Sequence, residues 1–200
     1  MALAQLYGMT DCESSVMGNE DRYLDLINFK SAKEIYERID DLPDESDEFE
    51  HLVRYLIFDL HAATEIEFRR ILYHTFRHQL FLTNDRNHND SMEKELSNMI
   101  SSLGFMEVFR ILRPILLSWP YEDFASIHEI DATRNQTAHA GRVEEVTYKG
   151  RNPFSDPDCL SQMYFDVWGM KQCFARHFEN VIERPRVVLQ RYIEKHGRDA

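Results

Sequence analysis

The sequence predicts an all-α fold, a helical bundle of four to five main helices with a short acidic helical extension at the N-terminus. Two observations predict this class. No glycine or proline occurs from Asp44 to Leu103, an interval that strands and their turns rarely allow. Within it, apolar residues from Phe49 to Ala63 recur at the spacing of one helix face. We therefore expect an extension over 1–46 and the bundle over 47–197.

The first predicted helices follow in order along the chain. After one or two short helices in the extension, a long helix is expected over about 47–82, with acidic residues in its first turns that suit the helix dipole. Turn-forming polar residues predict a loop over 82–90. Ser91 is then expected to cap a helix that Gly104 ends, and the next helical segment should kink at Pro114.

The second half of the bundle contains two further predicted helices. One is expected to begin beside Pro120 and to end near Arg134, because proline is favoured in a first turn. A long loop containing glycine and proline follows, with room for a short extended pair. Ser155 or Asp156 should cap the last long helix, which is interrupted near Pro185 and then resumes.

Composition limits the class of protein. The chain has 200 residues, 43% hydrophobic and 29% charged, as in a soluble globular protein with a sizeable core. No apolar run reaches the roughly 18 residues of a membrane span, and the first residues do not resemble a signal peptide. The three cysteines are scattered, which favours reduced thiols over a disulfide framework. We therefore expect a cytoplasmic protein with no membrane partner.

The negative charge is concentrated at the N-terminus. Residues 1–50 hold 14 Asp and Glu against 4 Lys and Arg, whereas the other 150 residues hold 21 against 19. The total of -12 therefore belongs mostly to the extension, and the nearly neutral body does not exclude a nucleic-acid partner. Two interpretations of the acidic segment stay open: it promotes solubility, or it is an arm that covers a basic site.

Few stretches of the chain resemble catalytic or metal-binding motifs. His74 and His78 lie four residues apart, but no third ligand follows at a convincing spacing, so a solvated helix face is favoured over a metal site. His128 begins a sequence like that of zinc proteases, but Ala132 stands where the second histidine should be. Neither a phosphate-binding glycine loop nor a nucleophile elbow is present. We expect no cofactor and no metal.

The run TRNQTAHAGR, residues 133–142, differs from its helical surroundings. It places Arg134 and Asn135 together and His139 four residues later. Arginine binds phosphate oxygens through a two-pronged guanidinium, and histidine can transfer a proton near neutral pH. RNA supplies its own 2′-hydroxyl nucleophile. On one continuous helix, Arg134 and His139 would point about 140° apart. Either the helix ends near Arg134, or a second copy of the chain completes the site.

This run resembles the signature of the HEPN superfamily, an arginine, commonly followed by a polar residue, and a histidine after four to six residues. The resemblance implies a helical bundle with metal-independent endoribonuclease activity, and many such nucleases are toxins or host-defence effectors. It assigns the catalytic roles to Arg134, Asn135 and His139. It also implies RNA as substrate, a homodimer and, for a toxin, an antitoxin. Some toxin members carry tyrosine where this chain has Gly141, so regulation through that tyrosine is not implied.

In the expected mechanism, His139 is a general acid or base and Arg134 stabilises negative charge on the transition state. Asn135 orients the phosphate or the histidine. Three further residues are candidates for support or substrate binding. Glu65 would position Arg134 from the long helix, Arg69 is the partner of Glu65 one turn later, and Arg142 would contact a phosphate.

Two other functions remain open. The bundle could be a non-catalytic module that dimerises or holds a partner protein. It could also bind a small ligand among its aromatic side chains, although aromatics at helical spacing are usually core residues. The aromatic candidates are Phe105, Phe109, Trp119 and Trp168. An arginine and histidine that share a solvent-open cleft would favour the nuclease, whereas burial of both in internal hydrogen bonds would favour the module.

Overall fold

The computed structural model describes residues 27–39, 41–42, 46–80, 86–114, 121–139 and 142–177. These residues form an all-α helical bundle, as the sequence predicts. The helices are α2 (Ile27–Ile39), α3 (Asp47–Leu80), α4 (Arg86–Ser102), α5 (Phe105–Leu112), α6 (Tyr121–His139) and α7 (Pro157–His177), with a short 3₁₀ turn, η1 (Val143–Glu145).

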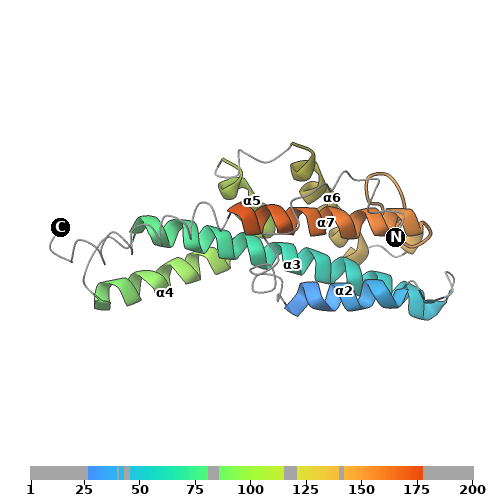
Figure 1. Ribbon diagram of the computed structural model, residues 1–200, viewed down its shortest axis with the longest axis horizontal. Helices are drawn as coiled ribbons and strands as arrows, with labels where there is room; N and C mark the ends of the chain where they lie inside the picture. The colour runs from blue at the N-terminus through green and yellow to red at the C-terminus, as the bar shows by residue number, and fades with distance from the viewer. Residues whose placement is uncertain are drawn as a thin grey trace, which may run out of the picture.

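Helix α3 is the axis of the bundle and contacts all five other helices. In Figure 1, α2 and α4 lie along its underside at opposite ends, whereas α5 and α6 lie above it. Helix α7 runs along α3 and also contacts α6. Because neighbours surround α3, its buried residues spread over several faces of the helix.

The start of α3 follows the rules that its sequence suggests. The hydroxyl oxygen of Ser46 accepts a hydrogen bond from the backbone N–H of Phe49 at 3.1 Å, which caps the helix. Acidic residues occupy the first turn, where the helix dipole favours them. Val53, Leu56 and Leu60 are fully buried. The predicted long helix is confirmed from Asp47 to Leu80.

Helix α4 begins earlier than its sequence predicts. The loop and Ser91 cap were wrong, because α4 already begins at Arg86 and Ser91 lies inside it. Leu96 and Ile100 are buried in the shared core, and Arg77 of α3 donates a hydrogen bond to Glu93 at 2.8 Å. Such tertiary contacts override the weak local preference of turn-forming residues.

Helix α6 continues beyond the expected end near Arg134 and includes His139. The prediction was wrong because contacts made by Thr137 support the last turn. The Thr137 side chain is buried and its hydroxyl donates to the carbonyl of Thr133 at 2.8 Å. Arg54 of α3 also donates a hydrogen bond to the Thr137 carbonyl at 3.2 Å. The whole motif from Arg134 to His139 is therefore helical.

The remaining connections agree more closely with the sequence. Gly104 separates α4 from α5, and its N–H donates to the Glu107 side chain at 2.7 Å. Asp156 rather than Ser155 caps α7, because its carboxylate accepts the N–H of Cys159 at 3.2 Å. Instead of an extended pair, the loop before α7 has one isolated bridge between Tyr148 and Arg151.

Three of the four aromatic residues proposed for ligand binding pack in the core or against it. Phe105 and Phe109 are buried, and their rings stack on Phe68 with centroids 5.5 and 5.8 Å away. Trp168 packs beside Phe29 at 5.4 Å. Trp119, the acidic residues 1–26 and the interruption near Pro185 lie outside the described residues. Among the described helices, none is long and apolar enough to cross a membrane.

Candidate functional site

The motif occupies the last two turns of α6. Arg134 is half-buried, whereas Asn135 and His139 are exposed. Because α6 is continuous, the backbone directs Arg134 and His139 about 140° apart around its axis. Asn135 and His139 are only about 40° apart and about 6 Å along the axis, so they share one face.

The side chain of Arg134 bends toward this shared face. Its guanidinium donates a hydrogen bond to the Oδ1 atom of Asn135 at 2.9 Å. The guanidinium carbon also lies 5.7 Å from the centre of the Phe58 ring on α3, within the range of a cation–π contact. The hydrogen bond to Asn135 draws the cation toward the side of α6 that carries His139, and the Phe58 contact holds it against α3.

His139 is the last residue of α6 and is exposed to solvent. The helix end that carries it is fixed to α3, because Arg54 holds the Thr137 carbonyl. Arg54 is itself held by Glu50, with a shortest nitrogen–oxygen distance of 2.9 Å. The positive charge of Arg54 also suits the negative, C-terminal end of the α6 helix dipole. His139 is therefore an exposed imidazole on an anchored turn.

The other polar residues of the motif hold the following loop. The side-chain oxygen of Gln136 accepts the backbone N–H of Thr147 at 2.8 Å. The hydroxyl of Thr133 donates to the carbonyl of the same Thr147 at 2.7 Å. One side of α6 is thus used for structure, whereas Asn135 and His139 are on its exposed side.

Two residues that were not candidates from the sequence join the motif. The carboxylate of Asp131 accepts a hydrogen bond from the Asn135 amide, with a nitrogen–oxygen distance of 3.4 Å. Its other oxygen lies 3.2 Å from Nε2 of His61 on α3. His61 is buried, and its ring packs on Phe105 with centroids 4.4 Å apart. The polar network therefore runs from α3 through Asp131 to Arg134.

Burial determines the protonation of His61. Loss of water around the ring lowers its pKa below the ordinary value of 6.5, and the charge of Arg134 acts in the same direction. The hydrogen bond and charge of Asp131 and the charge of Glu65 oppose this shift but do not reverse it. His61 is therefore a neutral imidazole near pH 7.

The spacing of residues in the sequence could have predicted some of the contacts in this network. Asp131 and Asn135 are one turn apart on a predicted helix, where polar pairs commonly meet. Phe58, His61 and Glu65 likewise share one face of the long helix. The contact between His61 and Asp131 spans 70 residues, so spacing alone could not identify it.

Glu65 and Arg69 form the expected pair, but their contacts lead away from the motif. Arg69 donates to Glu65, with a shortest distance of 2.6 Å, and to the carbonyls of Ile100 and Leu103 at the end of α4. These contacts hold the end of α4 against α3, and a role of Arg69 in substrate binding stays a prediction. The side-chain partner of Arg134 is Asn135. The negative charge of Glu65 influences the network through His61, whose pKa it acts to raise.

Arg142 is exposed three residues beyond His139, at the start of η1. This placement keeps Arg142 as a candidate phosphate contact next to the end of α6. Gly141 lies outside the described residues.

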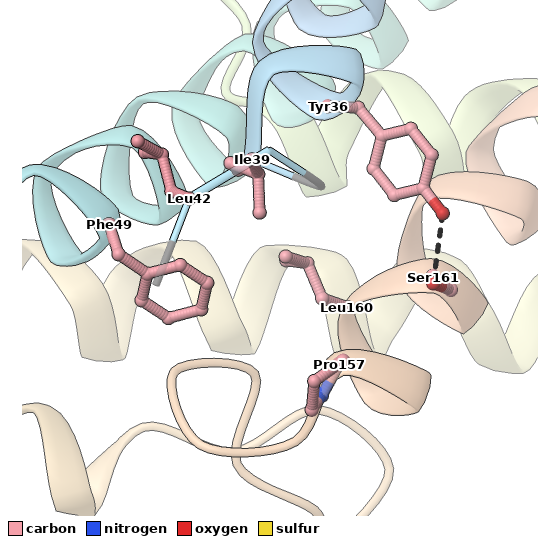
Figure 2. A pocket seen from close by; sticks show the side chains of 7 residues that line it. All are labelled: Tyr36, Ile39, Leu42, Phe49, Pro157, Leu160 and Ser161. Atoms are coloured by element: carbon pink, nitrogen blue, oxygen red, sulfur yellow. Dashed lines mark hydrogen bonds between the residues drawn. The ribbon is translucent and has the colours of Figure 1, made fainter. Parts of the chain in front are cut away.

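A pocket lies in another part of the bundle, where α2, the start of α3 and the start of α7 meet. Figure 2 shows the hydrogen bond at its edge, between the hydroxyls of Tyr36 and Ser161 at 2.9 Å. The other lining residues are Ile39, Leu42, Phe49, Pro157 and Leu160. None of the motif residues lines this pocket. Within the described part of the chain, no group of three or more His, Cys, Asp or Glu side chains is placed to hold a metal.

Comparisons of the chain with protein-family models, with curated proteins and with solved structures find no match. The relation to the HEPN superfamily therefore remains a prediction from the motif.

Proposed function

We propose that this protein is a metal-independent endoribonuclease of the HEPN type, of the kind that includes toxins and host-defence effectors. One observation carries the proposal. The guanidinium of Arg134 is hydrogen-bonded to Asn135, on the exposed face of α6 that also carries His139. A permanent cation and an imidazole thereby lie toward the same side of α6, a combination that can cleave RNA without a metal.

Each motif residue has a role in this proposal. His139 takes a proton from the 2′-hydroxyl of RNA or gives one to the departing 5′-oxygen. Arg134 stabilises the negative charge that grows on the phosphate oxygens in the transition state. Asn135 holds the guanidinium toward the substrate, and Arg142 contacts a neighbouring phosphate. The RNA provides the nucleophile, so the reaction needs no metal-bound water.

We propose a second copy of the chain as the partner for the surface beside Arg134. Tyr55 and Ile66 of α3 are 61% and 41% exposed and differ by only about 20° around the helix. Phe58 and Ala62 lie between them and are half-buried, and Arg134 lies over Phe58. Docking two copies along this apolar stripe of α3 would bring one copy's Arg134 close to the other copy.

The direct test of the activity uses matched RNA and DNA strands in the presence of EDTA. We expect wild-type protein to cut RNA and to leave DNA intact, because DNA lacks the 2′-hydroxyl. The 5′ fragments should end in 2′,3′-cyclic phosphate, which reports attack by that hydroxyl. A broad RNA panel left intact, or 5′ fragments that end in a 3′-hydroxyl, would contradict this mechanism.

The test of a shared site mixes two inactive proteins. If residues of two copies act together, His139→Ala and Arg134→Ala proteins should regain cleavage when mixed, because a heterodimer contains one site with both native residues. A Tyr55→Glu substitution should prevent this recovery by placing charge in the stripe. Recovery that is absent from a mixture shown to exchange subunits would restrict the site to one copy.

The exposed stripe also supports a second candidate function, a non-catalytic dimerisation or interaction module. Tyr55 and Ile66 are exposed on one side of α3, about 16 Å apart along its axis. An apolar surface of this kind can bind protein. A stable dimer with no effect on any RNA would favour this module. In that case an antitoxin or another partner protein would be sought on the same stripe.

A further inference from the structure

We infer that Asp131 and His61 are positioning residues that fix the Asn135 amide and thereby aim the Arg134 guanidinium at the face carrying His139. This inference rests on the proposed nuclease function. It concerns two residues that lie outside the Arg–x4–His motif, one of them buried on another helix.

The first step is the link between α3 and α6. Asp131 is the centre of this link, since one carboxylate oxygen lies 3.2 Å from His61 Nε2 and the other 3.4 Å from the Asn135 amide nitrogen. The side chain of His61 is 8% exposed and that of Asp131 is 23% exposed, so water competes little for the contact with the imidazole. The carboxylate is therefore held by a group on the rigid central helix.

The second step is the orientation of the amide. A carboxylate only accepts hydrogen bonds, so it selects the NH₂ end of Asn135. The carbonyl end must then point the other way, toward Arg134, which donates to it at 2.9 Å. The reversed amide would place its NH₂ group against a guanidinium that only donates. The charge of Asp131 thus determines which end of Asn135 meets Arg134.

The third step is the tautomer of His61. Because Asp131 only accepts, Nε2 of His61 must carry the hydrogen. The ring is held by Phe105 from α5, and the charged groups near it are Asp131 and Arg134 from α6 and Glu65 from α3. A neutral ring with hydrogen on Nε2 keeps this donor without adding a second cation beside Arg134.

A double-mutant cycle on cleavage tests whether Asp131 acts through Asn135. Loss of alignment at a transition-state contact costs about 10²-fold for a displacement of 1 Å, so we expect Asp131→Ala to lower the single-turnover rate by about 10- to 100-fold. In an Asn135→Ala background, the same substitution should have little further effect, because the amide it orients is gone. Equal losses in both backgrounds would overturn the inference.

Two more variants separate positioning from folding. Asp131→Asn keeps the shape but offers one acceptor oxygen to two donors, so its rate should fall while its thermal unfolding stays close to wild type. Glu129→Gln is the matched control on the same helix, because its amide oxygen can still accept the Lys149 N–H that Glu129 accepts at 3.2 Å. Its rate should equal that of wild type. A fully active, folded Asp131→Asn protein would contradict the positioning role.

An NMR measurement keeps the inference testable without any cleavage. The side-chain amide signals of Asn135 and the Nε signal of Arg134 should shift in Asp131→Asn and remain unchanged in Glu129→Gln. The nitrogen shifts of His61 should report hydrogen on Nε2 in wild type. Unchanged Asn135 and Arg134 signals in Asp131→Asn would overturn the inference whatever the activity. Wild-type protein that cuts no RNA would instead contradict the proposed function.

Discussion

Arg54 of α3 donates a hydrogen bond to the backbone carbonyl of Thr137, two residues before the exposed His139. The two residues are 83 positions apart in the sequence, and the contact joins the central helix to the last turn of the motif helix. Carbonyls at a helix end lack partners within the helix, so a side-chain donor there stabilises the turn. His139 is thus presented on a turn whose position depends on α3.

Replacing Arg54 should loosen that turn. A hydrogen bond from a charged donor contributes about 1.5–3 kcal/mol, and Arg54 is 28% exposed, so we expect Arg54→Ala to lower the free energy of unfolding by about 1–2 kcal/mol. Urea unfolding measures this change. The matched control is Glu50→Gln, which leaves the Thr137 contact in place. It weakens the pair within α3 and removes one acidic charge from its first turn, and should cost a few tenths of a kcal/mol. Equal stability of Arg54→Ala and wild type would show that the contact does not hold the turn.

The lowered pKa of His61 predicts a pH dependence of stability. The unfolded chain takes up a proton at His61 near pH 6.5, whereas the folded chain does so only at lower pH. The unfolded state therefore binds more protons in this interval, and stability falls as the pH drops below about 6.5. His61→Phe keeps an aromatic ring against Phe105 and removes the titration. The free energy of unfolding, measured with urea, should fall more between about pH 7.5 and 5.5 in wild type than in His61→Phe. An equal or smaller fall in wild type would contradict the direction of the shift.

Arg134→Lys should impair cleavage although it keeps the charge. Lysine cannot hold Asn135 and a phosphate through one planar group, and it loses the flat contact with the Phe58 ring. We expect a loss of about 10²-fold in the single-turnover rate, typical of removing a donor that stabilises a transition state. Arg110→Lys, an exposed site on α5, is the control and should retain the wild-type rate. A fully active Arg134→Lys protein would mean that charge alone suffices.

Local signals in the sequence predicted much of the fold. The absence of glycine and proline, the apolar spacing and the acidic first turn together predicted α3 as it is found from Asp47 to Leu80. The starts of α5 and α7 followed from Gly104 and Asp156. The start of α4 and the end of α6 were missed because contacts with α3, through Glu93 of α4 and Thr137 of α6, support helices whose local helix preference is weak.

The sequence could identify the motif residues of the candidate site, but not how their side chains contact one another. Sequence spacing placed Arg134 and His139 on different sides of a helix, but it could not show that Asn135 draws the guanidinium toward the histidine. His61 and Asp131 were missed because their contact depends on how α3 packs against α6. The carbonyl partners of Arg69 could not be predicted for the same reason, since they lie at the end of another helix.

The single-turnover rate of RNA cleavage by folded His139→Ala protein, measured with EDTA present, tests the central claim most directly. The matched control is His128→Ala, an exposed histidine three turns earlier on nearly the same face of α6. General acid–base catalysis contributes about 10²- to 10⁴-fold, so His139→Ala should lose at least that factor while His128→Ala keeps the wild-type rate. A folded His139→Ala protein that cleaves RNA as fast as wild type would contradict the account.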